Sequence, residues 1–560
     1  MSETEPAQDI DESTQTATVV EKSPSTNTSR EPLEELRVGR DGPGRSAHFI
    51  RVGVLGVIAG LIAVAFQWCL HESENWRMEL LAWLHADGRA AWGWMILPAV
   101  GLVVGSIVGA MVRKFEPDSS GSGIPHIKGS LLELREIRWK RLLPVKFIGG
   151  VLGVGMGLSL GREGPTVQLG ATVGRAMGDL LKLKPRVTGQ LVSCGAGAGL
   201  AAAFNAPLAG FIFVIEELRR EMSPITYAGA LLAAVCADIV ARFLTGSLPS
   251  FHIVDRVLQD SMTPLVAIPA VAVLGIVGGA AGVLFNKGLM RSSRVARSTM
   301  SRFPRLPSWS LTGLAGLIVG LVGWWIPEAL GGGHSVANDL LNNSFVSHAI
   351  WWIAVLLAAK LLLTWVSYAS GAPGGIFAPM LLMGALAGFL YGKAFQALFP
   401  GVDLDPRVMA MLGMAAWFTG SVRAPLTGIV LILEMTGNYN QLLPIAVACL
   451  ASYMTAERLK DEPIYEALLD EDLRHRGLGV VHAEPVPVVM GVQHGSILDG
   501  ALLRDAKFPV GCHVVHIERR GKEIVAIGST RVMAGDHVTV LTPGDTPESA
   551  LTVVDMCRAH

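Results

Sequence analysis

Residues 361–392 read LLLTWVSYASGAPGGIFAPMLLMGALAGFLYG, a run of 32 residues without a single Asp, Glu, Lys or Arg. A transmembrane helix needs about 20 mostly apolar residues, so this run is long enough to cross a bilayer. Its centre, Gly-Ala-Pro-Gly-Gly at 371–375, interrupts regular helix. In lipid, broken backbone is tolerated only when buried in protein or lining a cavity, so the break suggests an internal site. The alternative is a kink or a close helix contact, where glycine is common anyway.

The rest of the chain supports a membrane protein. Three further uncharged runs cover 90–112, 261–286 and 306–327, and only 17% of the 560 residues are charged. An ordinary soluble domain is roughly a quarter charged. We therefore predict an all-α polytopic membrane protein. Candidate spans lie near 49–71, 90–112, 143–160, 190–215, 224–245, 264–286, 309–326, 350–369, 374–398, 407–421, 422–436 and 441–457.

Both ends of the membrane part carry topology signals. Residues 1–47 are polar and lack a hydrophobic period, which predicts a disordered tail. Arginines cluster just before the first apolar run, and basic residues are concentrated in the connections 113–146 and 287–305. Because basic loops favour the cytosolic side, we expect these connections and both termini in the cytosol of a multi-pass cell-membrane protein. His126 and Lys128 are expected to face the cytosol.

The two halves of the membrane part resemble each other. Ala206-Pro207-Leu208 recurs as Ala424-Pro425-Leu426, and Glu216 recurs as Glu434, at an offset of 218. Gly161 and Pro165 recur as Gly375 and Pro379, at an offset of 214. Repeated blocks in one order indicate internal duplication, either parallel or inverted. Paired broken segments in corresponding places point to a transport site at the repeat interface.

The composition changes after about residue 470. Short alternating segments follow Val481, and His513–Glu518 and Glu523–Ile527 flank an Arg-Arg-Gly turn that predicts a hairpin. A further strand is expected over Val538–Leu541. We predict a small soluble α/β domain over residues 480–560.

Three glycine-rich segments suit an anion site: Gly121–Pro125 (GSGIP), Gly161–Pro165 (GREGP) and Gly374–Pro379 (GGIFAP). Each leads into an apolar helix, whose first turn offers unsatisfied N–H donors and about half a positive charge. Glycine lets the backbone approach the ion. Such donors hold an anion without the fixed charge of a lysine, which would trap it.

These segments resemble, in order, the three anion-binding signatures of the CLC chloride channel and transporter family. The resemblance covers about residues 50–470 and implies a transmembrane anion transport domain over 48–469. It also implies a homodimer in which each subunit has its own pathway, built from inverted repeats of tilted and broken helices. The implied transported species is chloride, with protons as the second species in the exchangers of the family.

The resemblance also implies roles for single residues. Ser122 would give a hydroxyl to the central chloride, the amides of Ile376 and Phe377 would be further donors, and Tyr465 would supply a second hydroxyl. The amides of Gly164 and Ala378 would serve an outer site. From the residues alone, Tyr465 is only an amphipathic side chain near an interface, which is the commoner role of tyrosine.

Glu163 is the sharpest candidate. An acid in an apolar, glycine-bounded break is costly and is a functional candidate by default. Its carboxylate resembles a bound anion, so helix-end donors that favour chloride favour the ionised side chain as well. The resemblance implies a gating glutamate that also takes the external proton. The alternative is a buried ion pair with Arg162.

The same resemblance makes Glu217 the internal proton acceptor of an exchanger. We therefore predict chloride/proton antiport, with a passive voltage- or pH-gated chloride channel of the same fold as the alternative. Glu216 and Glu217 could instead be solvated helix-end charges paired with Arg219 and Arg220. An intramembrane enzyme using Glu163 and Glu217 leaves the glycine-rich donor loops unexplained, so we expect no enzyme.

Further expectations concern selectivity and partners. Ser122 favours chloride, because the nitrate-preferring branch of the family tends to carry proline there. The last domain resembles the TrkA-C module through Gly500–Leu503, the Arg520-Gly521 turn and Gly535-Asp536, which suggests a prokaryotic protein whose tail binds a small molecule or supports dimerisation. No cofactor, metal or nucleic-acid partner is expected, and the net charge of −1 gives no hint of the last.

Overall fold

The computed structural model describes residues 43–86, 90–219, 224–246, 249–251, 253, 263–307, 309–342, 349–402, 404–476, 486–542 and 547–558. The predicted disordered tail lies almost entirely outside the described residues, and the first helix begins inside it, at Pro43.

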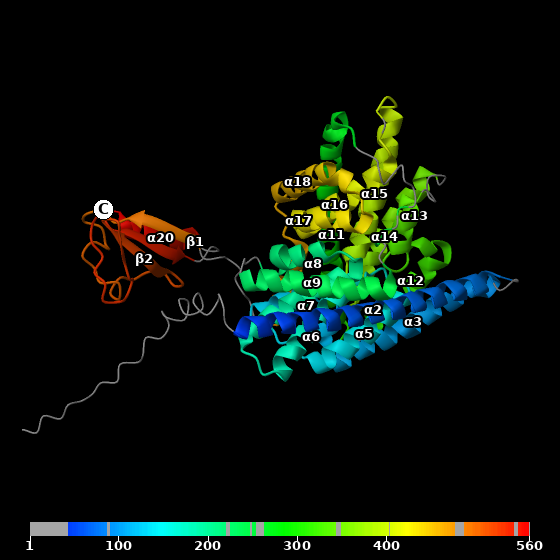
Figure 1. Ribbon diagram of the computed structural model, residues 1–560, viewed down its shortest axis with the longest axis horizontal. Coiled ribbons are helices and arrows are strands. Elements are labelled where there is room, and N and C mark those ends of the chain that lie inside the picture. The colour runs from blue at the N-terminus through cyan, green and yellow to red at the C-terminus, as the bar shows by residue number, and fades with distance from the viewer. Residues whose placement is uncertain are drawn as a thin grey trace, which may run out of the picture.

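Between Pro43 and His475 the described residues are mainly helical (Figure 1). In chain order its elements are α2 (Pro43–His85), α3 (Ala90–Phe115), η1 (Pro117–Ser119), α4 (Ile124–Leu131), α5 (Trp139–Gly155), α6 (Glu163–Leu180), α7 (Pro185–Phe204), α8 (Pro207–Phe213), η2 (Val214–Arg219), α9 (Pro224–Thr245), η3 (Leu265–Ala267), α11 (Ile268–Arg302), α12 (Ser310–Trp325), η4 (Pro327–Ala329), α13 (His334–Leu341), α14 (Ile350–Ala369), α15 (Phe377–Leu398), α16 (Pro406–Val422), α17 (Pro425–Thr436), η5 (Tyr439–Gln441), α18 (Leu442–Arg458) and α19 (Ile464–His475).

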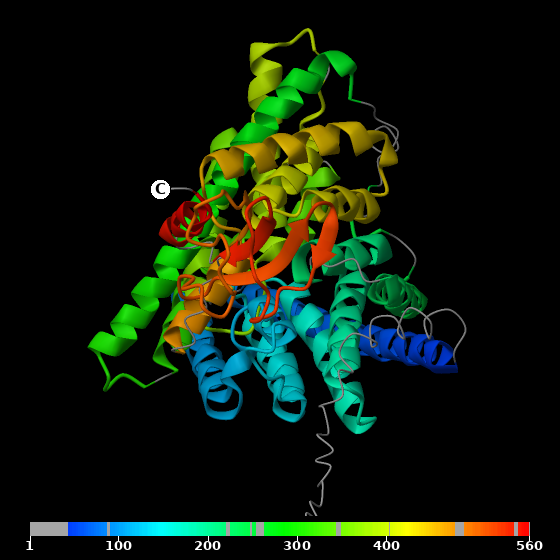
Figure 2. The ribbon, with the colours of Figure 1, turned by 90° about the vertical axis from the view of Figure 1, so that its left-hand side faces the viewer.

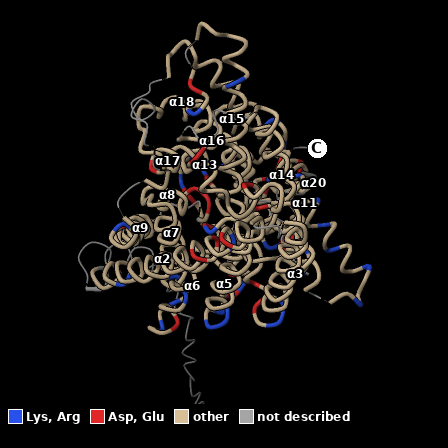
Figure 3. The backbone as a smooth tube through the Cα atoms, turned by 90° about the vertical axis from the view of Figure 1, so that its right-hand side faces the viewer, with Lys and Arg blue, Asp and Glu red and all other residues tan. Residues whose placement is uncertain are grey.

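Seven helices within the described ranges are long and apolar enough to cross a membrane. They are α2, α3, α7, α9, α11 with η3, α14 and α15, and several shorter helices lie among them. Figure 3 shows most of the helical backbone without charged residues, whereas Lys, Arg, Asp and Glu gather at loops and at a few internal positions. The predicted polytopic helical fold is confirmed.

The packing repeats between the two halves. Helices α2, α7 and α9 contact one another in the first half, and α11, α16 and α18 do the same in the second. The pairs α6–α7 and α15–α16 are also among the most extensive contacts. Figure 1 shows α2, α7 and α9 side by side. The order α2 to α9 therefore recurs as α11 to α18, which accounts for the repeated sequence blocks.

Two helix breaks lie directly before a proline, which cannot continue a helix because it lacks a backbone N–H. The prediction of one span over 190–215 is wrong, because α7 ends at Phe204 and α8 starts at Pro207. Between them Asn205 adopts a left-handed conformation (φ 53°), which asparagine tolerates. Arg423 takes the same place between α16 and α17, with φ 67°. No span was predicted over α6, whose segment is rich in glycine and threonine.

The C-terminal part has its own small core. Four strands, β1 (Val486–Gly491), β2 (His513–Arg519), β3 (Lys522–Ile524) and β4 (His537–Thr542), form an antiparallel sheet in the order β1-β4-β2-β3. The helix α20 (Pro547–Cys557) contacts β1 and β4 (Figure 2). The predicted hairpin is confirmed as β2–β3, but its second strand covers Lys522–Ile524 and not Glu523–Ile527. The predicted strand over Val538–Leu541 lies within β4.

Polar contacts fix the turn before β4. Arg519 donates two hydrogen bonds to the carboxylate of Asp536, at 2.7 and 2.8 Å, and the Met533 amide donates a third. Burial alone would raise the pKa of Asp536, but these hydrogen bonds and the positive charge of Arg519 hold it below its ordinary value.

Candidate functional site

The three glycine-rich segments meet at one place. Gly121 pairs with Pro373 and Gly161 pairs with Gly375 in short β-bridges between segments far apart in the sequence. The backbone N–H of Gly374 donates to the Gly121 carbonyl at 3.0 Å, and that of Gly375 donates to the Gly161 carbonyl at 2.8 Å. The bridge between Gly161 and Gly375 joins repeat-related positions, so the site lies at the interface of the two halves.

Three helices begin at these loops. They are α4 at Ile124, α6 at Glu163 and α15 at Phe377. The first amides of a helix have no partner within it, so three sets of donors and three positive helix ends converge. The contact is close at Gly164, where a Cβ would lie 2.9 Å from both the Gly375 Cα and the Ser122 carbonyl oxygen. Only glycine lets the loops approach this closely.

Glu163 points into this convergence. Its side chain is 1% exposed, and its Oε2 accepts a hydrogen bond from the Ala378 amide at 3.3 Å. Its Oε1 has no hydrogen-bond partner among the described residues. The Arg162 Nε lies 4.0 Å from Oε1. This distance is too long for a hydrogen bond, so Arg162 and Glu163 do not form the close ion pair of the alternative. The carboxylate therefore lies at the N-terminus of α15.

Two hydroxyl groups are buried near the loops. Ser122 is 1% exposed, and its Oγ accepts a long hydrogen bond of 3.4 Å from the Ile124 amide. Tyr465, in the first turn of α19, is fully buried, and its phenol oxygen has no hydrogen-bond partner among the described residues. Tyr465 lies close enough to Glu163 and Glu217 to interact with both electrostatically. An unsatisfied buried hydroxyl is costly, so a ligand is its natural partner.

The start of α15 supplies the remaining predicted residues. Ile376 and Phe377 are fully buried and Ala378 is 7% exposed. The Phe377 ring packs against Phe204 and Phe418, with centroid distances of 5.6 and 4.5 Å. This aromatic cluster fixes the first turn of α15, so its amides have a defined direction.

Glu217 lies on a different element. It belongs to the π-helix η2, is buried, and accepts a hydrogen bond from Lys128 Nζ at 2.8 Å. The alternative of a solvated helix-end charge is therefore wrong for Glu217. His126 and Lys128 are both buried and do not extend into solvent, and their position towards the cytosol stays a prediction. Lys128 turns inward on the short helix α4 because Glu217 accepts its charge.

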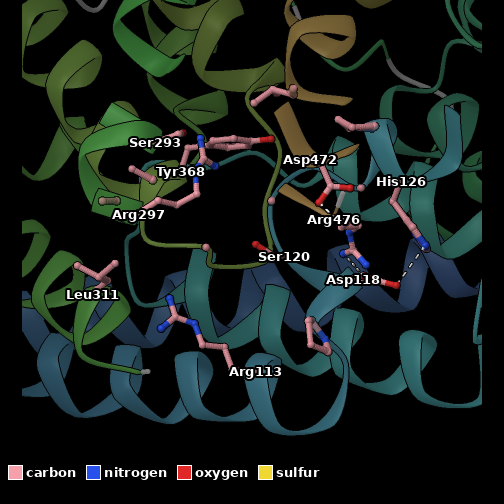
Figure 4. A pocket seen from close by; sticks show the side chains of 18 of the residues that line it. Arg113, Asp118, Ser120, His126, Ser293, Arg297, Leu311, Tyr368, Asp472 and Arg476 are labelled. Carbon is pink, nitrogen blue, oxygen red and sulfur yellow. Dashed lines mark hydrogen bonds and ion pairs between the residues drawn. The ribbon is translucent and has the colours of Figure 1, made fainter. Parts of the chain in front are cut away.

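A pocket of about 450 Å³ opens beside the Ser122 loop (Figure 4). Gly121, Gly123 and Tyr368 line it, together with four arginines, Arg113, Arg135, Arg297 and Arg476. Two carboxylates, Asp118 and Asp472, also line it and pair with Arg135 and Arg476. Since arginines outnumber acids, the pocket attracts anions towards the loop.

Sequence reasoning missed a fourth loop and two buried lysines. Gly331 and Gly333 have positive φ angles of 61° and 81°, and precede α13 as Gly121 and Gly123 precede α4. Fully buried Lys146 donates to the Ser119 and Gly121 carbonyls, whereas Lys360 donates to the Ala329, Leu330 and Gly331 carbonyls. The two lysines are 214 residues apart, the offset of the repeat, which is the signal that could have found them.

No group of three or more His, Cys, Asp or Glu side chains placed to hold a metal ion occurs in the described part of the chain. The donors assembled at the loops are instead amides and hydroxyls. Such groups donate hydrogen bonds, so they suit an anion.

Solved structures of other proteins share this fold. The chain superposes on a slow cyanobacterial Cl⁻/H⁺ antiporter with a TM-score of 0.70 and 33% identity, covering 77% of this chain and 99% of the other. It superposes on a CLC-type fluoride/proton antiporter with a TM-score of 0.60, at 24% identity, covering 74% and 96%. The second likeness shows the fold alone.

Sequence comparisons agree with the structural ones. The chain is 38% identical to the H(+)/Cl(−) exchange transporter ClcA of Klebsiella pneumoniae, covering 76% of this chain and 89% of that protein. It is 37% identical to the ClcA protein of Vibrio parahaemolyticus, covering 76% and 90%. The TrkA-C domain model matches residues 490–549, and the voltage gated chloride channel model matches residues 104–457. The chain is therefore a multi-pass membrane protein that belongs to the voltage gated chloride channel family.

Proposed function

We propose that this protein exchanges chloride for protons across the membrane. One observation carries the proposal: the Glu163 carboxylate accepts the Ala378 amide at the N-terminus of α15, where the glycine-rich loops converge. An ionised carboxylate and a chloride ion compete for such donors because both carry one negative charge. Protonation of Glu163 removes its charge and leaves the donors to chloride, which links the two transported species.

The site residues take complementary roles in this proposal. Ser122 and Tyr465 give hydroxyl hydrogen bonds to a central chloride, and the amides of Ile376 and Phe377 add two further donors. The amides of Gly164 and Ala378 serve an outer position that the Glu163 carboxylate can also occupy. The unpartnered phenol of Tyr465 supports this assignment, because a central chloride would satisfy it.

Exchange also needs a proton acceptor on the opposite side of the site. Glu217 fits this role, because it is buried, is held by Lys128 and lies within electrostatic range of Tyr465. A passive chloride channel has no use for a second buried acid of this kind. The relatives named as H(+)/Cl(−) exchange transporters support the same choice.

We place the arginine-lined pocket on the cytosolic side, where it collects chloride for the Ser122 loop. The two basic connections predicted to be cytosolic supply Arg135 and Arg297 to this one pocket, in agreement with the positive-inside rule. Both chain termini are then cytosolic and the protein resides in the cell membrane. We further propose a homodimer with one pathway in each subunit, since all the loops of the site come from one chain. The TrkA-C domain is proposed to bind a small regulatory molecule.

Reconstitution into liposomes tests the exchange. A chloride gradient across the vesicle membrane is expected to drive protons against their own gradient, measured with a pH electrode outside lightly buffered vesicles. Glu217→Gln is expected to keep chloride flux and lose proton movement. Chloride flux without any proton movement in the unmodified protein would favour the channel, and the absence of any chloride flux would refute both functions.

A further inference from the structure

Lys128 lies between two carboxylates. Its Nζ is 2.8 Å from the Glu217 Oε1 and 3.6 Å from the Glu466 Oε1. Glu217 belongs to η2 and Glu466 to the first turn of α19, so the lysine on α4 joins three elements that are far apart in the sequence. Glu466 directly follows Tyr465, the buried tyrosine of the proposed chloride site.

Glu466, Lys128 and Glu217 form a row of charges in which the exposed fraction of the side chain decreases. The Glu466 side chain is 35% exposed, that of Lys128 is 9% exposed and that of Glu217 is 2% exposed. The row therefore leads from solvent to a buried acid through one ammonium group. The row also differs from the arginine-lined pocket, because none of its three residues lines that pocket. Chloride and protons thus have separate groups at the inner surface.

We infer that Glu466 and Lys128 form a proton relay that supplies Glu217 from the cytosolic side. This inference rests on the proposed exchange. In the first step the Lys128 ammonium gives a proton to the Glu217 carboxylate, which breaks an N–H bond, forms an O–H bond and leaves a neutral amine. In the second step the amine takes a proton from protonated Glu466, which then takes one from solvent. The net result is one proton carried from solvent to Glu217: Lys128 and Glu466 are back in their starting states, and Glu217 becomes a carboxylate again when it passes its proton on towards the chloride site.

The row is set among other charges that are already paired. On α4 the second titratable group is His126, whose Nε2 lies 3.6 Å from Asp118. On α11, Arg294 and Arg297 pair with Glu471. Beyond α16, Arg423 pairs with Glu457 and Asp461. These neighbouring groups have charged partners of their own, whereas Lys128 contacts both Glu217 and Glu466.

Lys128→Arg separates a relay from a counter-ion. A guanidinium preserves the positive charge between the two acids but cannot be deprotonated in a protein. We expect chloride-driven proton movement to fall by about tenfold or more while chloride flux persists, as when a positioned proton donor is lost. Chloride binding measured by calorimetry should stay close to that of the unmodified protein. Unchanged proton movement in Lys128→Arg would overturn the relay.

Glu466→Gln tests the outer member of the row. We expect proton movement to slow and to depend more steeply on the pH at the cytosolic side, whereas Glu466→Asp restores most of the rate. Glu462→Gln removes an exposed acid four residues earlier and is the matched control, expected to leave proton movement unchanged. Equal effects of Glu462→Gln and Glu466→Gln would contradict a specific relay. If the unmodified protein moves no protons at all, the proposed exchange itself fails, which is a distinct result.

Discussion

At position 163 a buried carboxylate lies at the N-terminus of α15. Its Oε2 accepts the Ala378 amide, and its Oε1 has no hydrogen-bond partner within the described residues. Glu163→Gln retains the shape of the side chain but removes the charge and the titration. We therefore expect chloride flux to persist, to become insensitive to pH and to carry no protons. Chloride and proton fluxes are measured together in liposomes from about pH 4.5, near the usual glutamate pKa, to about pH 7.5, about three units above it.

The control for this variant is Glu79→Gln, which changes an exposed acid on α2. It is expected to leave the pH dependence of chloride flux intact. A Glu163→Gln protein that still moved protons in response to a chloride gradient would show that Glu163 is not the external proton acceptor.

Gly164 is predicted to tolerate no side chain. A Cβ would lie 2.9 Å from backbone atoms of Gly375 and Ser122, so an added methyl group must push the loops apart. We expect Gly164→Ala to lower chloride flux by about ten- to hundredfold, the effect of misplacing binding groups by about 1 Å. Gly153→Ala is the control, because its nearest new contact is an ordinary 3.5 Å. Equal fluxes in the two variants would contradict the close approach of the loops.

Some site residues could be predicted from sequence and others could not, for a physical reason. The glycine-rich loops and Glu163 are visible because glycine and an isolated acid are unusual inside apolar runs. Lys128 gave no such signal, since a lysine near a loop usually extends into water. Its burial depends on Glu217, which lies 89 residues away in the chain. Long-range pairing of this kind is fixed by the tertiary fold, and no local pattern reveals it.

At the scale of elements, the two halves exchange helix caps. The Glu216 carboxylate accepts the amides of Leu426 and Thr427 at the start of α17, at 3.1 and 2.7 Å. Its repeat counterpart Glu434 accepts the amides of Leu208 and Ala209 at the start of α8, at 3.1 and 2.8 Å. Each carboxylate thus satisfies two otherwise unpaired donors at a positive helix end. The reading of Glu216 as a solvated helix-end charge is corrected by these contacts.

This exchange predicts matched losses of stability. Removing a capping side chain typically costs about 0.5–2 kcal/mol. We expect Glu216→Ala and Glu434→Ala each to lower the free energy of unfolding by about 1–2 kcal/mol, since each loses two amide hydrogen bonds at a helix N-terminus. Glu216→Ala also loses the hydrogen bond from the Thr427 hydroxyl, so its loss is expected at the upper end of this range. Thermal unfolding in detergent, compared with exposed Glu462→Ala as control, measures the loss. A loss confined to one of the two variants would show that the caps are not equivalent.

The helix predictions succeeded where apolar runs were long and failed at breaks. Spans such as 224–245 and 350–369 coincide with α9 and α14. The error at 190–215 arose because hydropathy stays high across Asn205-Ala206-Pro207, although the proline forces Ala206 out of helical geometry (φ −132°, ψ 77°). Hydropathy reports burial in an apolar phase, whereas chain breaks depend on backbone chemistry. Both signals are needed to predict a broken-helix fold.

At the scale of the whole molecule, the helical part and the C-terminal part have separate cores. The buried residues of the sheet domain, such as Leu498, Val532, Val540 and Val553, form a cluster of their own. Helix α19 carries Tyr465 at one end, and its other end is tied to the helical part by contacts of Arg135 with Asp472 and of Arg476 with Asp118. The proposed site is therefore complete before the sheet domain begins.

Truncation of the sheet domain tests its role. Deleting residues 480–560 retains α19 and all of its anchoring pairs, so we expect chloride and proton movement to continue at a rate close to that of the full chain. If the domain binds a regulatory small molecule, a low-molecular-weight cell extract will change the flux of the full chain but not that of the truncated one. Size-exclusion chromatography with light scattering gives the oligomeric state of both. A truncated protein that becomes monomeric, with no response to extract in either form, would instead assign the domain to dimerisation. Loss of a dimerisation domain changes the oligomeric state, whereas loss of a ligand-binding regulatory domain changes the response of the transport rate to the ligand.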